Sequence, residues 1–344
     1  MGTKITLPSD GIVLGIETSC DETSAGVLRG SDLASVIISS QLFHSKYGGV
    51  IPELASRAHL KTIIPVIEEA LAQANVSAKE LTAVAATNTP GLLGALLVGV
   101  NTAKGLALSL GIPLIGVHHI EAHIFSALLE AEKPELPFLA LVVSGGHTML
   151  VIVKAVGVYT VIGKTLDDAA GEAFDKVGKM LGLGYPAGPV VDRVSQTGNP
   201  NFMHFPRPMI YEATYDFSFS GIKTSVLYYL RDNPEVITTH LNDVAASFQQ
   251  AVVDVLVAKT MRAAKEYNIH DIVCVGGVSA NTGLRAALSE QASKTGRRFL
   301  TTRPMLSTDN AAMIAMLGAL KLEQGLADSL ALTSHARSPL SVTL

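Results

Sequence analysis

The chain has 344 residues, of which 48% are hydrophobic and 16% are charged, and it contains 30 glycines and no tryptophan. This composition is typical of a folded globular protein and excludes a disordered one, and the length suffices for two domains. The formal net charge of -4 excludes nucleic-acid binding through overall positive charge, so a nucleic-acid partner must meet a local basic patch.

The cysteine content and the hydropathy of the chain indicate its cellular compartment. Cys20 and Cys274 lie far apart in the sequence, which predicts no disulfide framework and favours a reducing environment. Residues 1–10 lack the apolar centre of a secretory signal. The most apolar stretch, residues 91–117, is interrupted by polar residues and a proline, whereas a bilayer span needs about 20 uninterrupted apolar residues. We therefore predict a buried helix and a strand there, and a cytoplasmic protein with no membrane partner.

Apolar runs bounded by turn residues predict strands, and runs that are apolar throughout are typical of strands covered on both faces. These runs span residues 11–17, 82–88, 113–118, 138–144, 149–155 and 271–277. Helical periodicity lies between them, for example at residues 53–75, 93–110, 167–182, 240–267 and 309–323. This alternation predicts an α/β fold.

One pattern occurs twice in the chain. Residues 14–28, "LGIETSCDETSAGVL", and residues 139–153, "LALVVSGGHTMLVIV", each join two apolar strands through a small polar turn. The repetition predicts a duplicated architecture with a cleft between two lobes. The charged, proline-bearing segment 131–137 is the predicted boundary between them.

Two histidines, His119 and His123, stand four residues apart in "VHHIEAHIFS". On an α-helix of about 3.6 residues per turn they share one face and can bind one metal ion. In the zinc-peptidase pattern His-Glu-x-x-His, the catalytic base directly follows the first histidine. Here Glu121 comes two positions after His119, roughly 200° around the helix, so it cannot be that base. A helix whose histidines are merely surface or packed residues is an equally simple interpretation.

A third ligand would favour the metal site, and Asp309 in "STDNAAMIAML" is one candidate. Ser307, Thr308 or Asp309 before an apolar helical run is most simply a helix N-cap. Two histidines and one carboxylate would leave coordination positions open for a substrate and would suit iron(II) or zinc. Spacing alone does not bring residue 309 to residue 119.

Three polar turns could approach an anionic ligand through the backbone. Residues 142–148, "VVSGGHT", offer N–H groups between two strands that can hold a phosphate or carboxylate. Residues 274–285 predict a strand, a Gly-Gly turn and a helix, where Asn281 offers a donor and an acceptor. Glycine is common in such connections, but together with "SCDETS" at residues 19–24 these turns favour an anionic or nucleotide ligand.

The densest polar stretch is residues 167–192, in which Asp175 and Lys179 stand four apart on a predicted helix. Such a pair could be an ordinary exposed ion pair. The rigid turn "GYPAGP" and then Asp192 follow, and an acidic residue beside a glycine-rich turn can accept hydrogen bonds from ribose hydroxyls. A solvated helix and loop is the alternative. The basic run at residues 293–304 likewise fits either a solvated face or a phosphate contact.

Taken in order, these segments resemble the tRNA threonylcarbamoyladenosine transferase family, formerly named O-sialoglycoprotein endopeptidase, over residues 11 to 325. The motifs that carry the resemblance are "LGIETSCDETS", "KYGGVIPELASRAHL", "PGLLGALLVG", "HHIEAH", "LVVSGGHT", "LDDAAGEAFDKVGKMLGLGYP", "DFSFSGIKTSV", "GGVSANTGLR" and "STDNAAMIA". The unbroken "GYP" stretch and the length are most similar to the bacterial branch.

The resemblance implies the actin-like ATPase fold of sugar kinases and heat-shock ATPases, with two ribonuclease-H-like lobes around a nucleotide cleft. The N-terminal lobe would span residues 10–130 and be completed by the C-terminal helix near residues 309–325. The C-terminal lobe would span residues 135–308. This agrees with the duplicated strand–turn–strand pattern.

The resemblance also implies a set of site residues. The family's metal ligands match His119, His123 and Asp309, which would hold one divalent ion per subunit, Fe²⁺ first and Zn²⁺ second. The family's substrate contacts match Val142, Val143, Ser144, Gly145, Gly146, Asp175, Gly188, Asp192 and Asn281. Asp21 and Glu22 are our candidates for proton handling or for positioning the amine. The chain departs from the family at Thr89 and Ala187, where glycine is common, and Ala187 puts the backbone path beside Gly188 in question.

The implied activity is transfer of a threonylcarbamoyl group from threonylcarbamoyl-adenylate to N6 of the adenosine just 3′ of the anticodon in ANN-decoding tRNA, forming t6A and releasing AMP. In bacteria the family works with a paralogous inactive actin-like subunit and a small ATPase subunit. The alternatives are a metallopeptidase, an ATPase or kinase-like member of the same fold, and a noncatalytic scaffold. Magnesium prefers oxygen ligands, which argues against the kinase.

Overall fold

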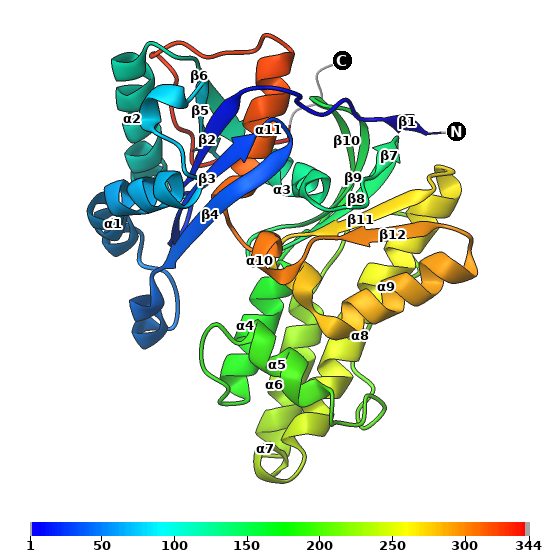
Figure 1. Ribbon diagram of the computed structural model, residues 1–344. Helices are drawn as coiled ribbons and strands as arrows, with labels where there is room; N and C mark the ends of the chain where they lie inside the picture. The colour runs from blue at the N-terminus through cyan, green and yellow to red at the C-terminus, as the bar shows by residue number, and fades with distance from the viewer. Residues whose placement is uncertain (1, 341–344) are drawn as a thin grey trace.

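The computed structural model describes residues 2–340 and contains two five-stranded sheets with the same topology (Figure 1). The first sheet has the order β4-β3-β2-β5-β6, with β2 (Ile12–Glu17), β3 (Glu22–Arg29), β4 (Asp32–Ser40), β5 (Ala83–Thr89) and β6 (Leu114–His118). The second has the order β10-β9-β8-β11-β12, with β8 (Phe138–Val143), β9 (Thr148–Ala155), β10 (Val158–Lys164), β11 (Asp271–Val275) and β12 (Arg298–Thr301). In each sheet three antiparallel strands are followed by two parallel ones. The predicted α/β fold and its duplication are confirmed.

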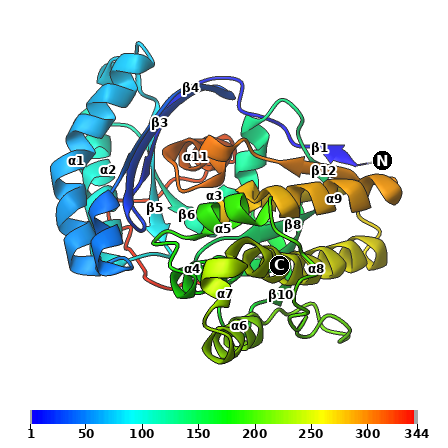
Figure 2. The ribbon, with the colours of Figure 1, turned by 90° about the horizontal axis from the view of Figure 1, so that it is seen from below.

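The helices form three layers around these sheets (Figure 2). The first layer, α1 (Pro52–Gln73) and α2 (Leu93–Leu110), covers the outer face of the first sheet. The middle layer is α3 (His119–Phe125) and α11 (Ala311–Glu323). The third layer and its connections comprise α4 (Ala170–Met180), α5 (Gly188–Ser195), α6 (Ser220–Asp232), α7 (Val236–Thr239), α8 (Leu241–Glu266), α9 (Thr282–Lys294) and α10 (Pro304–Ser307).

Short elements complete the chain. They are the two-stranded pair β1 (Thr3–Lys4) and β7 (Glu135–Leu136), and the 3-10 turns η1 (Leu42–Tyr47), η2 (Ala78–Glu80), η3 (Ser126–Leu129) and η4 (Gly277–Ala280).

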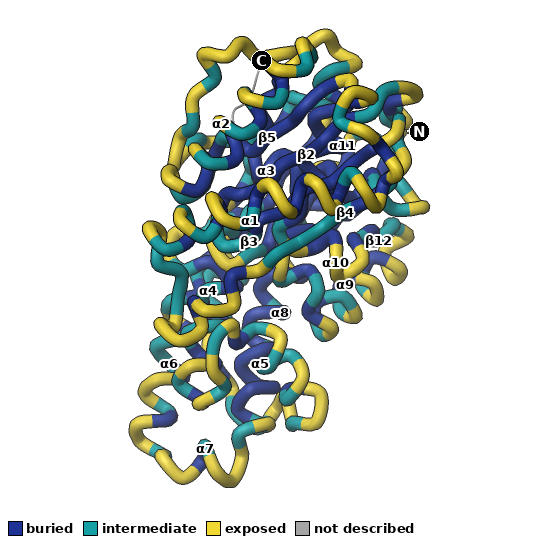
Figure 3. The backbone as a smooth tube through the Cα atoms, turned by 60° about the vertical axis from the view of Figure 1, so that its left-hand side comes forward, coloured by how far each residue is buried: buried dark blue, intermediate teal, exposed yellow. Residues whose placement is uncertain are grey.

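The middle layer is the most buried part of the fold (Figure 3). Every residue from Ala311 to Leu320 of α11 is buried, and so is all of α3, because side chains of both sheets join them in one apolar cluster. On the first-sheet side α11 lies directly on β2: a Cβ built on Gly15 would be 2.3 Å from the carbonyl oxygen of Ala311. The chain therefore returns at its C-terminal end to the sheet that its N-terminal strands form.

Helix α2 is less buried than the sequence predicts. It is long and apolar enough to cross a membrane by length and composition, and 33% of its residues are buried in the structure. Its inner face packs on β5 and α1, whereas Leu93, Leu97 and Leu108 are exposed. The buried-helix prediction is thus right for one face only, because only that face meets the sheet.

Candidate metal centre and adjoining cleft

The candidate residues gather at the carboxyl ends of parallel strands, where ligands bind in open α/β sheets. In the first sheet β2 leads into residues 18–22, and β6 leads directly into α3. In the second sheet β8 leads into residues 144–147, and β11 leads into η4 and Asn281. Because β8 and β11 pair in parallel with Val142 opposite Val275, the turns that follow them lie side by side.

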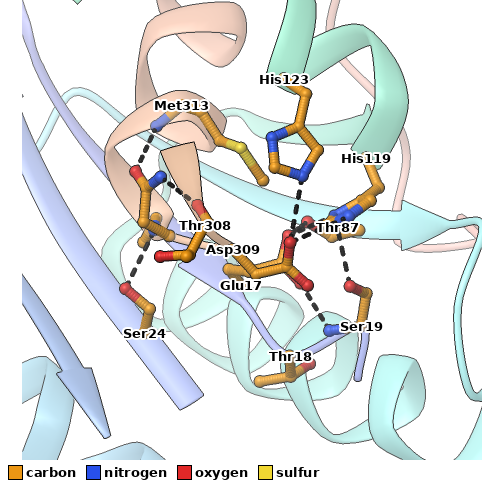
Figure 4. Close-up of polar contacts among 12 residues, drawn as sticks. Glu17, Thr18, Ser19, Ser24, Thr87, His119, His123, Thr308, Asp309 and Met313 are labelled. Atoms are coloured by element: carbon orange, nitrogen blue, oxygen red, sulfur yellow. Dashed lines mark hydrogen bonds and ion pairs between the residues drawn. The ribbon is translucent and has the colours of Figure 1, made fainter. Parts of the chain in front are cut away.

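His119, His123 and Asp309 converge on one point (Figure 4). One ligand atom from each lies within 4.8 Å of the other two. The Oδ1 atom of Asp309 is 3.0 Å from Nε2 of His123 and 3.4 Å from Nε2 of His119. Both imidazoles are buried, with 8% and 1% of their residue surfaces exposed. The shared face that the four-residue spacing predicts is therefore present.

Asp309 is free to face the histidines because its neighbour caps α11. The side-chain oxygen of Asn310 accepts a hydrogen bond from the backbone N–H of Met313 at 3.2 Å. The prediction that Ser307, Thr308 or Asp309 is the N-cap is therefore wrong, since an amide one residue later satisfies the first turn.

Glu17, which the sequence analysis missed, orients His119. Its Oε2 atom lies 3.0 Å from Nδ1 of His119 and accepts a hydrogen bond from Thr87 Oγ1 at 2.6 Å. The Ser19 hydroxyl is 3.2 Å from the same Nδ1 atom. A carboxylate at Nδ1 fixes the ring so that Nε2 points toward Asp309, as in carboxylate–histidine–metal arrangements. The available signal was an acidic residue ending the apolar strand "GIVLGIE".

The charges of this cluster stabilise one another. Burial alone would raise the pKa of the Asp309 carboxyl, but His119 and His123 hold this pKa well below its ordinary value. Burial would lower the pKa of His119, but Asp309 and Glu17 raise it well above its ordinary value. A cation at this point would replace the proton that the facing groups otherwise share.

The donor set fits a divalent metal. Two imidazole nitrogens and one carboxylate oxygen suit iron(II) or zinc and leave coordination positions open. The Nε2 atom of His123 faces Asp309. The other ring nitrogen, Nδ1, is buried and has no hydrogen-bond partner among residues 2–340.

The turn after β8 presents backbone rather than side chains. Val142 and Val143 are fully buried residues of β8, main chain and side chain alike, so the part of the predicted set that is open to a ligand begins after them, at Ser144. Gly145 and Gly146 are exposed, and their N–H groups have no hydrogen-bond partner within the described range. The Ser144 carbonyl accepts from Gly171 N at 3.2 Å, so the turn rests on the first turn of α4.

His147 connects this turn to the histidine pair. Burial lowers its pKa to about 4, and the charges of His119 and His123 contribute to the same shift. His147, at the end of the glycine turn, is therefore within electrostatic reach of the histidine pair.

The remaining predicted substrate residues lie on α4, α5 and the start of α9, and hydrogen bonds join these three helices into one wall. Asp175 accepts hydrogen bonds from Ala187 N at 2.8 Å and Gly188 N at 3.1 Å, so it fixes the turn before α5. Asp192 accepts from the Thr282 hydroxyl at 2.8 Å. These carboxylates therefore hold the backbone in place whether or not a ligand is bound.

Asn281 belongs to the same wall and caps α9. Its side-chain oxygen accepts from Leu284 N at 2.9 Å, while its amide donates to Gln249 Oε1 at 2.7 Å. It lies at the end of the Gly-Gly turn, as the sequence predicts.

Asp21 lies in the turn between β2 and β3, and Glu22 is the first residue of β3. Burial, together with the negative charges of Asp309 and Asp21, raises the pKa of Glu22 to about 9. At neutral pH this carboxyl is therefore protonated and can donate a hydrogen bond.

The basic run contributes little free charge. Arg298 donates to the Asp271 carboxylate at 2.9 and 2.5 Å, and Arg303 lies 3.4 Å from a Glu130 oxygen. Arg297 donates to backbone carbonyls instead, including that of Ile269 at 3.0 Å. The solvated-face interpretation is closer to what is observed, with the guanidinium groups bound to carboxylates or carbonyls of their own chain.

Comparison with known proteins identifies the family of this chain. A family model described as tRNA N6-adenosine threonylcarbamoyltransferase matches residues 32–316. Curated relatives of that name include one from Chlorobium phaeobacteroides (strain BS1), 52% identical over 326 residues with 91% of this chain and 94% of the relative covered. Another, from Syntrophotalea carbinolica, is 51% identical over 332 residues with 96% and 97% covered.

Solved structures at low sequence identity share the fold. Component A of the Acidaminococcus fermentans (R)-2-hydroxyglutaryl-CoA dehydratase has a TM-score of 0.56 at 16% identity and covers 91% of this chain and 100% of its own. Full-length HypF in its phosphate- and nucleotide-bound form has a TM-score of 0.60 at 14% identity, with 93% and 47% covered. These likenesses assign the actin-like ATPase fold. With that fold, and with half of its residues identical to such relatives, the chain belongs to the tRNA N6-adenosine threonylcarbamoyltransferase family.

Proposed function

We propose that this protein transfers the threonylcarbamoyl group of threonylcarbamoyl-adenylate to N6 of the adenosine just 3′ of the anticodon in ANN-decoding tRNA, with a divalent metal at His119, His123 and Asp309. The adenine N6 forms a bond to the carbamoyl carbon, the bond from that carbon to the phosphate oxygen breaks, and AMP leaves with the electron pair. The observation that carries the proposal is the convergence of two buried histidines and the partly buried Asp309 in a chain of this family.

We assign the metal as Fe²⁺ first and Zn²⁺ second, since both suit this donor set. When bound, the ion supplies a Lewis acid that polarises an oxygen of the donor and holds it in place. Glu17 keeps the His119 ring in its binding orientation, because its carboxylate lies 3.0 Å from the Nδ1 atom.

The chain's own groups bind and orient the donor. The free N–H groups of Gly145 and Gly146 are suited to the carboxylate or phosphate oxygens of the donor. Asp175, Asp192 and Asn281 maintain the wall on which the AMP portion would lie. Placement is the main contribution, because an exocyclic amine is a poor nucleophile and correct orientation can supply up to roughly 7–11 kcal/mol of the barrier.

The proton of the attacking amine must go to a nearby base or to water. Asp21 is the residue we propose for this role, and Glu22, protonated at neutral pH, would donate a hydrogen bond beside it. The two neighbouring carboxyls would thereby have different tasks, one accepting the proton and the other donating a hydrogen bond.

The tRNA is implied by the family, and we propose two protein partners: a paralogous inactive actin-like subunit and a small ATPase subunit. Exposed apolar side chains on α1 and α2, including Leu60, Ile64 and Leu97, offer a surface on which a protein could pack. We propose the cytoplasm as the location, where tRNA and the reducing conditions preferred by free cysteines are found.

A metallopeptidase is less well supported. Glu121 is directed away from the histidine pair, and its carboxylate contacts Tyr159 and Lys321 instead. The relatives' names also favour the transferase.

The test is product formation from defined components. Metal-loaded protein is incubated with threonylcarbamoyl-adenylate, unmodified ANN-decoding tRNA and the two partner proteins, and t6A is quantified by mass spectrometry after digestion. His123→Ala should lower product by at least about 10-fold, because it removes one of the three converging atoms.

His118→Asn is the matched control. His118 belongs to the same motif, but its Nε2 atom is 3.3 Å from the Ser338 carbonyl and it lies outside the cluster. It should leave product formation near the wild-type level. Absence of t6A from the wild-type mixture would contradict the proposed reaction, and equal losses in the two variants would contradict the metal assignment.

A further inference from the structure

Helix α3 also makes specific contacts through the face opposite the histidines. Glu121 and Phe125 are spaced four residues apart, as His119 and His123 are, but two positions further along the helix. Both contact the same partner: the Tyr159 hydroxyl bonds to the Glu121 carboxylate, and the Tyr159 ring centroid is 6.2 Å from that of Phe125.

The contacts of Glu121 form a hydrogen-bonded network at the wall of a pocket of about 470 Å³. Its Oε1 atom accepts a hydrogen bond from the Tyr159 hydroxyl at 2.5 Å, and that hydroxyl accepts one from Gly157 N at 2.7 Å. Its Oε2 atom is 3.5 Å from Nζ of Lys321, which donates to the Gly116 carbonyl at 3.1 Å. Glu121 is 5% and Tyr159 2% exposed, so a charged group sits where only such partners make it tolerable.

The partners come from different parts of the fold. Tyr159 belongs to β10 of the second sheet, Lys321 to α11, and Gly116 to β6 of the first sheet. One carboxylate on α3 is thus tied to both sheets and to the helix that follows Asp309.

A helix as short as α3 needs such external anchors. It has seven residues and no side-chain cap at its N-terminus, so its own backbone hydrogen bonds are few. Side-chain ends lie roughly 6 Å from a helix axis, so a rotation of about 10° would move them by about 1 Å. Metal–ligand distances tolerate about 0.2 Å, so the rotation of α3 decides whether both Nε2 atoms can reach one ion.

We propose that Glu121 is a positioning residue: held by Tyr159 and Lys321, it fixes the rotation of α3 and thereby directs His119 and His123 toward Asp309. The inference rests on the proposed metal site and deepens it, because it assigns a role to the acidic residue inside the histidine motif. Glu121 does not touch the metal or the substrate; it acts through the helix that carries the ligands.

The test measures metal binding rather than catalysis. Glu121→Gln keeps the side chain's shape and removes its charge toward Lys321, and Tyr159→Phe removes the hydroxyl that holds it. Metal affinity is measured by competition with a chromophoric chelator, and the Co²⁺-substituted protein reports ligand geometry through its visible absorption spectrum. We expect each variant to bind metal about 10-fold or more weakly and to shift the Co²⁺ spectrum.

Asp271→Asn is the matched control. Asp271 is also a buried carboxylate, 2% exposed, bound to a cation, Arg298, at 2.5 Å. It lies at the start of β11, away from the strand end that faces the cleft. We expect this variant and Glu121→Gln both to lose thermal stability, because each leaves a partly buried cation without its charged partner, but only Asp271→Asn should keep wild-type metal affinity and Co²⁺ spectrum.

The outcomes separate the two proposals. If Glu121→Gln and Tyr159→Phe are destabilised but bind metal like the wild type with an unchanged spectrum, Glu121 is a structural group only and the inference is overturned. If the wild-type protein itself binds no metal, the metal site of the proposed function fails with it. Tyr159→Phe, the smaller change, decides the matter if Glu121→Gln does not fold.

Discussion

The contact between β2 and α11 gives a sharp test of how Asp309 is placed. Gly15 lies in β2, and a Cβ at this position would be 2.3 Å from the Ala311 carbonyl oxygen and 2.6 Å from Ala315 N. Both are backbone atoms of α11, so no side chain can rotate away. Since non-bonded heavy atoms prefer roughly 3.5–4.0 Å, Gly15→Ala must push the start of α11 outward by about 1 Å.

Overpacking of this kind typically costs about 1–3 kcal/mol, and we expect that loss in the free energy of unfolding. The same displacement should reach Asp309, two residues before α11 begins, and move its carboxylate relative to the histidines. Urea unfolding followed by circular dichroism, with a chelator present, measures the packing loss alone. Metal affinity measured by competition should also fall, because the third ligand is no longer in reach.

Gly105→Ala is the matched control, since it makes the same chemical change where nothing lies within 4 Å of the added Cβ. Gly105 is inside α2, so alanine there should stabilise the protein by about 1 kcal/mol through helix propensity. Opposite signs for the two variants are the expected result. A Gly15→Ala protein that unfolds at the wild-type urea concentration would refute the close-packing argument.

Three further predictions concern His59, Asn281 and the metal site; His59 is a buried residue of α1 whose Nε2 atom lies 3.0 Å from the Cys20 carbonyl. Burial lowers the pKa of His59 from its ordinary value of 6.5, so as pH falls through 6.5 the unfolded chain binds a proton before the folded protein does. The free energy of unfolding should therefore fall between pH 7.5 and 5.5, as measured by urea unfolding, and it should fall less in His59→Gln. Asn281→Ala removes the hydrogen bond to Leu284 N and should cost about 1–2 kcal/mol in the same assay, unlike the exposed Ser293→Ala on the same helix. Adding metal at about 100 times its dissociation constant should raise the free energy of unfolding of the wild type by about 2.7 kcal/mol and that of His123→Ala by much less, as measured by thermal or urea unfolding.

Sequence patterns predict the strands that are most fully buried. Residues 11–17, 82–88, 138–144 and 271–277 are apolar because helices cover both faces, and each became a strand within a residue or two. The edge strand β6 was predicted for the same reason, since four of its five residues are buried. In the two five-stranded sheets, the strands that neither a predicted run nor the repeated pattern covers are β4, β10 and β12, edge strands that keep more partly exposed residues, so their pattern is weaker.

The sequence predicted some residues of the site and missed others. The four-residue spacing alone placed His119 and His123 on one face, because helix geometry is local. Asp309 is 186 residues from His123 in sequence, and only the family resemblance joined it to them. Glu17 escaped notice because a buried carboxylate is recognisable only when its partners are known. The cap at Asn310 was missed because several polar residues precede α11 and any of them could serve.

The arrangement around α3 explains why the histidine motif suggests a peptidase and yet supports a different chemistry. In a peptidase the acid directly follows the first histidine and faces the metal with it. Here the acid is one position later, which turns Glu121 to the opposite side, onto Tyr159 and Lys321. Two histidines and one glutamate would then give two ligands and an anchor instead of two ligands and a base. A transfer reaction whose donor already carries a good leaving group needs no strong base at the metal; it needs ligands held still, and a helix fixed on both faces provides that.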